Sequence, residues 1–139
     1  MPTEPTLLEG KRILITHADQ FMGPMLCEVL SRHGADVIRD TSRLLDPHEP
    51  QALIQQSGTI DILVANLSTP APSTAVEDVD DNEWRDTFAA LVDPLPRLCR
   101  AVLPQMIERQ KGKVLVMGSA SALRGIKYSS TYCAARGAQ

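Results

Sequence analysis

A serine, a tyrosine and an arginine late in the chain have the side chains and the spacing that proton transfer requires. Ser119 follows an apolar run, Tyr132 comes 13 residues later, and Arg136 lies four residues after Tyr132. Positions four apart share one face of a helix, so the guanidinium of Arg136 can approach the phenol of Tyr132. A free phenol titrates near pH 10, and a permanent positive charge within about 4–6 Å favours the phenolate. Tyr132 would then remove a proton from a substrate oxygen that the Ser119 hydroxyl orients.

The same residues also have a purely structural interpretation. Tyr132 and Arg136 can form a stacked or solvated helix pair, and Ser119 can be an ordinary turn residue. Spacing alone leaves both interpretations open. Two further polar residues near expected strand ends are predicted to be structural. Asp40 is expected to cap a turn, although an acid at the end of a second strand can also bind the ribose of NAD. His17 is expected to be a polar turn residue.

Short apolar runs alternate with helix-length amphipathic segments along the chain. The runs predict buried strands, and the segments between them predict helices. The expected strands are 13–15, 36–38, 60–66 and 114–117, and the expected helices are 25–32, 50–56, 83–109 and 131–139. In the first helix, helical spacing is shared by Met25, Leu26, Val29 and Leu30.

The segment at 83–109 has recognisable start and break signals. Asp80 or Asn82 can cap its first turn, and three prolines are expected to bend or interrupt it, at positions 94, 96 and 104. Within the third apolar run, Asp61 is expected to anchor backbone rather than to take part in catalysis.

Strands that are each followed by a helix indicate an α/β fold. We predict a Rossmann-like, doubly wound parallel sheet with helices on both faces. Ligands bind at the carboxyl ends of the strands in such sheets, and Ser119 follows the last expected strand. The length of 139 residues suits one domain, so residues 1–139 are predicted to be a single Rossmann-like domain.

Composition excludes several classes of protein. With 43% apolar and 22% charged residues, the chain is not of the disordered class. The net charge of −3 and the absence of any large Lys/Arg cluster argue against nucleic-acid and anionic-membrane partners. No apolar run approaches the roughly 20 residues that span a bilayer, and the first residues lack a signal-peptide pattern. Cys27, Cys99 and Cys133 lack CxxC spacing, so we expect reduced thiols, no metal site and a cytoplasmic protein.

From about Gly10 to its last residue, the chain resembles the short-chain dehydrogenase/reductase superfamily, and within it the halohydrin dehalogenases. Ser119…Tyr132-x-x-x-Arg136 stands where the superfamily has Ser…Tyr-x-x-x-Lys. Three further segments carry the resemblance: the first strand motif at 10–16, the central strand motif at 60–66, and the end of a long crossover helix at 100–104.

The departures from the superfamily pattern concentrate at the nucleotide site. Members that bind a nucleotide need Thr-Gly-x-x-x-Gly-x-Gly after the first strand, so that backbone can approach the pyrophosphate. Here the segment reads THADQFMG over 16–23, with His17 and Phe21 in place of two glycines. Asn66 is followed by Leu-Ser rather than Ala-Gly, and Leu91 replaces the asparagine of the superfamily's proton relay. Arg136 replaces the lysine that bonds the nicotinamide ribose, a contact that a planar guanidinium does not copy.

The resemblance therefore implies a lyase that works without a cofactor. Tyr132 would take the proton from the hydroxyl of a vicinal haloalcohol oriented by Ser119, and the alkoxide would displace the halide to give an epoxide. The reverse reaction would open epoxides with azide, cyanide or nitrite. Phe21 would border the halide site, and Ser121 would line the substrate pocket. Two alternatives remain: an NAD(P)-dependent oxidoreductase with an atypical glycine loop, which would use NAD or NADP, and a non-catalytic subunit.

The resemblance also bears on completeness and assembly. Relatives continue for two more strands and several helices, so the chain is expected to be truncated at its C-terminus, and poorly folded and inactive in isolation. Homotetramers are expected by family resemblance, through the helices at 83–109 and after Thr131.

Overall fold

The computed structural model describes residues 6–139 and shows an α/β fold. Four parallel strands form one sheet in the order β2-β1-β3-β4. The strands are β1 (Arg12–Ile15), β2 (Asp36–Arg39), β3 (Ile62–Ala65) and β4 (Lys113–Val116). The sheet confirms the predicted fold class, and each strand overlaps one of the expected apolar runs.

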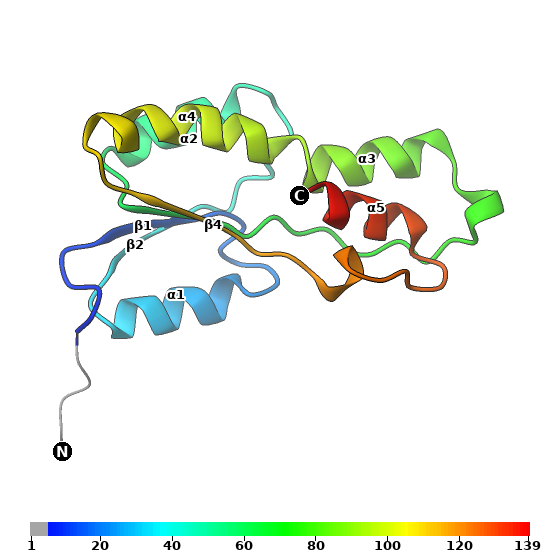
Figure 1. The fold of residues 1–139 in the computed structure, drawn as a ribbon, viewed down its shortest axis with the longest axis horizontal. Helices are drawn as coiled ribbons and strands as arrows, with labels where there is room; N and C mark the ends of the chain where they lie inside the picture. The colour runs from blue at the N-terminus through cyan, green and yellow to red at the C-terminus, as the bar shows by residue number, and fades with distance from the viewer. Residues whose placement is uncertain (1–5) are drawn as a thin grey trace, which may run out of the picture.

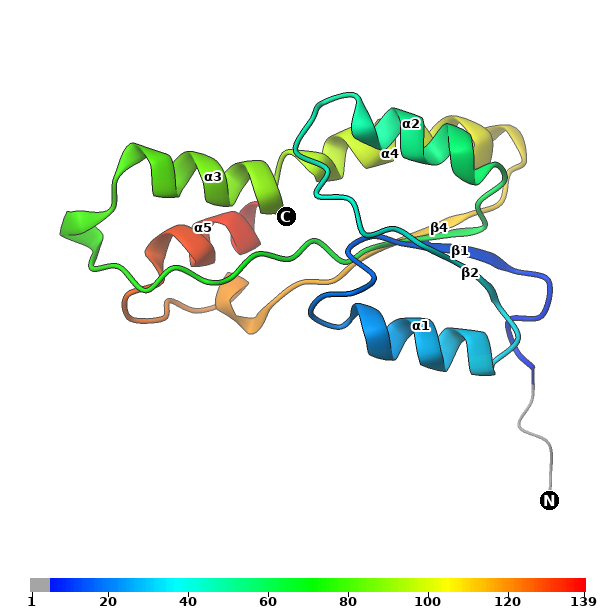
Figure 2. The ribbon, with the colours of Figure 1, turned by 180° about the vertical axis from the view of Figure 1, so that it is seen from behind.

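Helices cover both faces of the sheet, and two more lie beyond its carboxyl edge. Helix α1 lies on one face, and α2 and α4 lie together on the other (Figure 1). Helices α3 and α5 lie side by side past the ends of the strands (Figures 1 and 2). Their bounds are α1 (Gly23–Arg32), α2 (Glu49–Ser57), α3 (Asp81–Leu91), α4 (Pro94–Glu108) and α5 (Ser130–Ala138), with short 3-10 helices η1 (Val76–Asp78) and η2 (Ala120–Ala122).

The core forms two layers because successive strand residues point to opposite faces. Leu14 and Leu63 are fully buried in the layer under α2 and α4. Ile13 and Ile15 are equally buried in the other layer, where they pack with Cys27 of α1. Burial on both faces explains why the two central strands, β1 and β3, are short apolar runs rather than alternating ones.

Prolines divide the segment expected as one helix at 83–109. Helix α3 starts two residues before Glu83, because the Asp80 carboxylate accepts a hydrogen bond from the Glu83 backbone N–H at 2.7 Å and caps the first turn. Pro94 opens α4, in the first turn, where its missing N–H costs nothing. Pro104 lies inside α4. The expected interruption is confirmed, and it falls at the two residues before Pro94.

Asp61 anchors backbone, as expected, and also joins the sheet to the end of α4. Its Oδ2 accepts a hydrogen bond from the backbone N–H of Arg12 at 3.0 Å, and its Oδ1 accepts one from Arg109 Nη1 at 3.0 Å. The backbone N–H of Arg12, together with the Arg109 guanidinium, lowers the pKa of Asp61. The ionised carboxylate therefore stabilises the fold.

Acidification is expected to destabilise the protein through Asp61. Because the pKa of Asp61 is lower in the fold than its unfolded value of about 3.9, its contribution is full above roughly pH 5 and is lost as the pH falls through the folded pKa. Asp61→Asn is expected to lower the free energy of unfolding at pH 7 by about 1.5–3 kcal/mol and to reduce the loss on acidification. Urea unfolding of the intact protein across this pH range measures both effects.

Asp36→Asn is the matched control, because the side chain of Asp36 is 64% exposed in its ion pair with Arg12. Such surface pairs contribute only about 0–1 kcal/mol. An Asp61→Asn variant with the acid sensitivity of the wild type would contradict the assignment.

Within residues 6–139, no helix is long and apolar enough to cross a membrane. Over the same residues, no group of three or more His, Cys, Asp or Glu side chains is placed to hold a metal ion. The three cysteines are free, and Cys27 is buried.

Candidate active site

Two serines form the turn that follows β4 at the carboxyl edge of the sheet. Ser119 caps η2, and its hydroxyl oxygen accepts a hydrogen bond from the backbone N–H of Ser121 at 3.2 Å. The Ser121 hydroxyl donates to the same oxygen at 2.8 Å, and Ser121 is buried. Because η2 packs against α5, this turn lies beside the helix that carries Tyr132 and Arg136. The structure thus joins Ser121 to Ser119.

Tyr132 and Arg136 are in direct contact on one face of α5. The Nε–H of Arg136 donates a hydrogen bond to the Tyr132 hydroxyl oxygen at 3.0 Å. The Arg136 guanidinium carbon is also 5.1 Å from the Tyr132 ring centroid. The four-residue spacing therefore places the cation against the phenol, as the sequence predicted, and Arg136 is only 3% exposed. Of the two structural alternatives, a solvated helix pair does not describe a guanidinium buried to this degree, whereas a stacked pair is compatible with the 5.1 Å separation.

Arg136 is held by neutral groups alone. Its Nη1 donates to the backbone carbonyl of Met117 at 3.2 Å and to the side-chain oxygen of Gln139 at 3.0 Å. None of the ion pairs formed within residues 6–139 involves Arg136. A buried cation without a carboxylate partner favours a negatively charged group bound beside it.

Glu83 ties α5 to its surroundings. One carboxylate oxygen accepts from the Thr131 hydroxyl at 2.9 Å, and the other accepts from the Thr74 hydroxyl at 2.6 Å. The backbone N–H of Thr74 in turn donates to the carbonyl of Tyr128 at 2.7 Å. A residue of α3 therefore fixes the position of the residue next to Tyr132. The sequence analysis did not single out Glu83, although its place three residues after Asp80 is the acidic position of a capping box.

The loop between β1 and α1 keeps a backbone suited to glycine while carrying two large side chains. His17 has φ 45° and Phe21 has φ 51°, in the left-handed region that non-glycine residues rarely adopt. Phe21 is 55% exposed, and its ring centroid lies 5.6 Å from the Arg136 guanidinium carbon. Gly23 must remain glycine, since a Cβ there would lie 2.5 Å from the His17 carbonyl oxygen. Phe21 is thus a neighbour of Arg136 rather than a core residue.

His17 and Asp40 are buried polar residues at the ends of β1 and β2. Nδ1 of His17 accepts a hydrogen bond from the Ser68 backbone N–H at 3.0 Å, which leaves the proton of the neutral ring on Nε2. Burial lowers the pKa of His17 and raises the pKa of Asp40. Asp40 caps a turn, as predicted, by accepting from the Ser42 N–H at 3.1 Å and hydroxyl at 2.7 Å. Nε2 of His17 and Oδ2 of Asp40 are buried without hydrogen-bond partners.

Asn66 holds the loop between β1 and α1 in place. Its side-chain Nδ2 donates to the carbonyl oxygens of His17 at 3.1 Å and Gln20 at 3.0 Å, and its backbone N–H donates to the Thr16 hydroxyl oxygen at 3.0 Å. The Asn66 side chain is fully buried. The amide thus fixes the path of the loop that carries Phe21 to Arg136.

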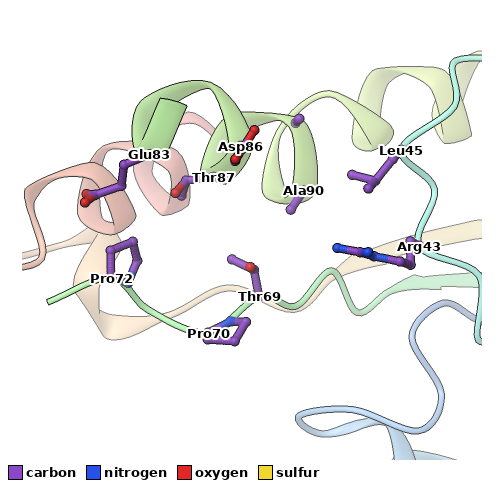
Figure 3. A pocket seen from close by; sticks show the side chains of 10 residues that line it. Arg43, Leu45, Thr69, Pro70, Pro72, Glu83, Asp86, Thr87 and Ala90 are labelled. Carbon is purple, nitrogen blue, oxygen red and sulfur yellow. The ribbon is translucent and has the colours of Figure 1, made fainter. Parts of the chain in front are cut away.

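A cavity of about 610 Å³ lies between the segment after β3 and helix α3. The Arg43 side chain extends toward the space between Thr69 and Ala90, and Asp86 points into it from α3 (Figure 3). Ser119, Tyr132 and Arg136 are not among its lining residues. The cavity is therefore separate from the three residues singled out for chemistry.

Comparisons with known proteins establish the family. Residues 48–139 match the family model described as short chain dehydrogenase. The chain belongs to the short-chain dehydrogenase family. It is 32% identical to the 2-keto-3-deoxy-L-fuconate dehydrogenase of Xanthomonas campestris, over 95% of this chain and 51% of that protein. It is 27% identical to the 3-oxoacyl-acyl-carrier-protein reductase FabG of Vibrio harveyi, over 93% of this chain and 63% of that protein.

Two solved structures of similar proteins share the fold of this chain but carry different names. A structure described as a dehalogenation enzyme superposes with a TM-score of 0.86 at 28% identity, over 95% of this chain and 63% of that one. A gluconate 5-dehydrogenase of Burkholderia cenocepacia, in complex with NADP and tartrate, superposes with a TM-score of 0.88 at 21% identity, over 99% of this chain and 65% of that one. The chain spans only part of each of these proteins. It covers 51–66% of the lengths of the two relatives, the two structures above and a third similar structure. The second likeness shows the shared fold alone.

The loop at 16–23 fits a dinucleotide poorly for a member of this family. A pyrophosphate rests on open backbone N–H groups, which glycines leave accessible. Here the His17 ring is buried against Ser68, and the Phe21 ring lies beside the Arg136 guanidinium. Asp40 does fit a ribose, because its buried Oδ2 has no partner within the described chain. The side chains present therefore do not match the pyrophosphate part of a dinucleotide.

Proposed function

We propose that the intact protein is a cofactor-independent dehalogenase of vicinal haloalcohols, a lyase that forms an epoxide and a halide ion. The contact between Tyr132 and the buried, carboxylate-free guanidinium of Arg136 carries this proposal, because it favours a phenolate base. The likeness to a dehalogenation enzyme at 28% identity supports it. So do the His17 and Phe21 side chains in the loop where a nucleotide needs glycine.

In the proposed mechanism, Tyr132 as phenolate takes the hydroxyl proton of the substrate. The Ser119 hydroxyl donates a hydrogen bond to the same substrate oxygen and orients it. The resulting alkoxide attacks the neighbouring carbon, the C–O bond of the epoxide forms, and the carbon–halogen bond breaks with its electron pair leaving on the halide. The products are an epoxide, a halide ion and the proton, which Tyr132 returns to solvent. Alignment of the three reacting atoms supplies much of the rate.

Phe21 and Ser121 are proposed to line the substrate pocket beside Tyr132. Phe21 would place its ring beside the leaving halide, and Ser121 would hold the Ser119 oxygen that it already contacts at 2.8 Å. In the reverse direction, azide, cyanide or nitrite would open an epoxide at the same site. We propose a homo-oligomer, a tetramer by family resemblance, without nucleic-acid or membrane partners.

Halide release decides whether this function holds. The full-length protein is incubated with 1-bromo-2-propanol and no nucleotide, and bromide and proton release are followed together. Equal amounts of bromide, protons and epoxide, above the rate in buffer, are the expected result. No release above that background, with measurable binding of NADH, would overturn the proposal.

The second candidate is an NAD(P)-dependent oxidoreductase of this family. The names of the two relatives favour it, because one is a dehydrogenase and the other is a reductase. So does the buried, unpartnered Oδ2 of Asp40 at the end of β2, which suits a ribose hydroxyl. Oxidation of alcohols with NAD or NADP, lost on Asp40→Ala with the fold retained, would support this candidate.

Two substitutions of Phe21 are expected to separate the effect of its ring on the rate from the effect of its backbone strain on stability. Phe21→Ala and Phe21→Gly both remove the ring beside Arg136, so both are expected to slow dehalogenation about tenfold, the scale of one lost cation–π contact. Phe21→Gly is expected to be more stable than Phe21→Ala by about 1 kcal/mol, because only glycine adopts φ 51° without cost. Urea unfolding and bromide release measure the two effects, and equal stability of the two variants would contradict the strain.

A further inference from the structure

The side chain of Gln139 links Arg136 to the end of helix α3. Its amide oxygen accepts a hydrogen bond from Arg136 Nη1 at 3.0 Å, and its amide nitrogen donates to the backbone carbonyl of Leu91 at 2.6 Å. Leu91 is fully buried and is the last residue of α3, and Gln139 is half-buried. The amide thus bridges the buried guanidinium and a helix end that belongs to a different part of the chain.

An acceptor at this point can be neutral or charged, and the difference decides the electrostatics of the site. A carboxylate would form a buried ion pair with Arg136 and would offset most of the positive charge felt by the phenol. A glutamine satisfies the same N–H and leaves the charge uncompensated. Apart from Tyr132, the remaining acceptor of Arg136, the Met117 carbonyl, is a neutral group too. The whole set of partners therefore preserves the positive charge.

The bridge also fixes the direction in which Arg136 points. The guanidinium is planar, and its Nε–H and Nη1–H bonds are in rigid relation to each other. When Gln139 and Met117 hold Nη1, the Nε–H is directed at the Tyr132 oxygen. Without Gln139, Nη1 keeps one anchor in place of two, and the guanidinium can turn about it.

We propose that Gln139 is a positioning residue, a neutral clamp that holds Arg136 against Tyr132 without neutralising it. This inference rests on the proposed function, in that Tyr132 acts there as the base.

Two substitutions of Gln139 separate charge from position. Gln139→Glu keeps the acceptor for Arg136, adds a negative charge and, like Gln139→Met, loses the donor to the Leu91 carbonyl. The added charge is expected to raise the pH at which the rate reaches half its plateau by about one unit, with about tenfold slower turnover at pH 7. Gln139→Met keeps the length and removes both hydrogen bonds, so the plateau rate is expected to fall about tenfold with little change in that pH. Gln51→Glu and Gln51→Met on the exposed face of α2 are the controls, expected to behave as wild type.

The first readout is the rate of bromide release from 1-bromo-2-propanol as a function of pH. The second is a pH titration of the ultraviolet absorbance of the Tyr132 phenolate. It is obtained as the difference between each Gln139 variant and the same variant carrying Tyr132→Phe. The absorbance needs no turnover. If the wild type releases no bromide but Gln139→Glu raises the pH of phenolate formation, the proposed function fails and the clamp stands. If wild type turns over and Gln139→Glu and Gln139→Met match it in both readouts, the clamp is wrong and the proposed function stands. Should Gln139→Glu not fold, Gln139→Met with a wild-type plateau rate is enough to overturn the clamp.

Discussion

Tyr132→Phe is expected to lower the rate of bromide release by about 10²–10⁴-fold, the range that a positioned general base contributes, with the fold unchanged. The phenol is half-buried on α5, and its oxygen accepts the hydrogen bond from Arg136 Nε at 3.0 Å. Phenylalanine keeps the ring beside the guanidinium, 5.1 Å from its carbon in the wild type, and removes only the oxygen. The loss should fall on turnover more than on substrate binding, because the oxygen acts in the proton-transfer step.

Tyr128→Phe is the matched control for this substitution. Tyr128 lies four residues earlier, is 50% exposed and stacks with Lys127 rather than with Arg136. Its loss of a hydroxyl is expected to leave bromide release and unfolding within experimental error of the wild type. A Tyr132→Phe variant that retains full turnover and a cooperative unfolding transition would remove Tyr132 from the mechanism and would favour a non-catalytic subunit.

The sequence predicted the sheet well because the signals for it are local. Strands β1 and β3 are buried apolar runs, and β2 and β4 each carry a short apolar run, so composition and length alone identify them. The division of 83–109 into two helices follows from Pro94, and the cap of α3 follows from Asp80, both of which act within one turn. The contact of Tyr132 with Arg136 is local too, because one helical turn separates them.

The sequence was less informative where a residue's surroundings come from distant parts of the chain. In α1 the apolar spacing of Met25 and Val29 marks a helix, yet these residues are 62% and 39% exposed, and Cys27 is the one buried against the sheet. Periodicity identifies an amphipathic helix, but the angle at which it packs selects the buried face. Glu83 and Gln139 were missed for the same reason: their partners lie 48 residues away in sequence.

Asn66→Ala is expected to destabilise the protein by about 1–3 kcal/mol, because it removes two buried hydrogen bonds. The His17 and Gln20 carbonyls then keep only their backbone donors, the N–H groups of Gln20 and Gly23, so the loop after β1 loses its side-chain support. Phe21 should then leave the Arg136 guanidinium, and bromide release should fall along with stability.

Asn82→Ala tests whether any asparagine would have this effect, because Asn82 is exposed in the first turn of α3 and accepts only from Arg85 at 3.3 Å. A surface change of that kind is expected to stay within about 0.5 kcal/mol of wild type. Urea unfolding gives both values. If Asn66→Ala unfolds like Asn82→Ala, the loop is held by its own backbone. In that case the left-handed conformations of His17 and Phe21 arise without the amide, and the position of the Phe21 ring beside Arg136 has to be explained by contacts of the ring itself.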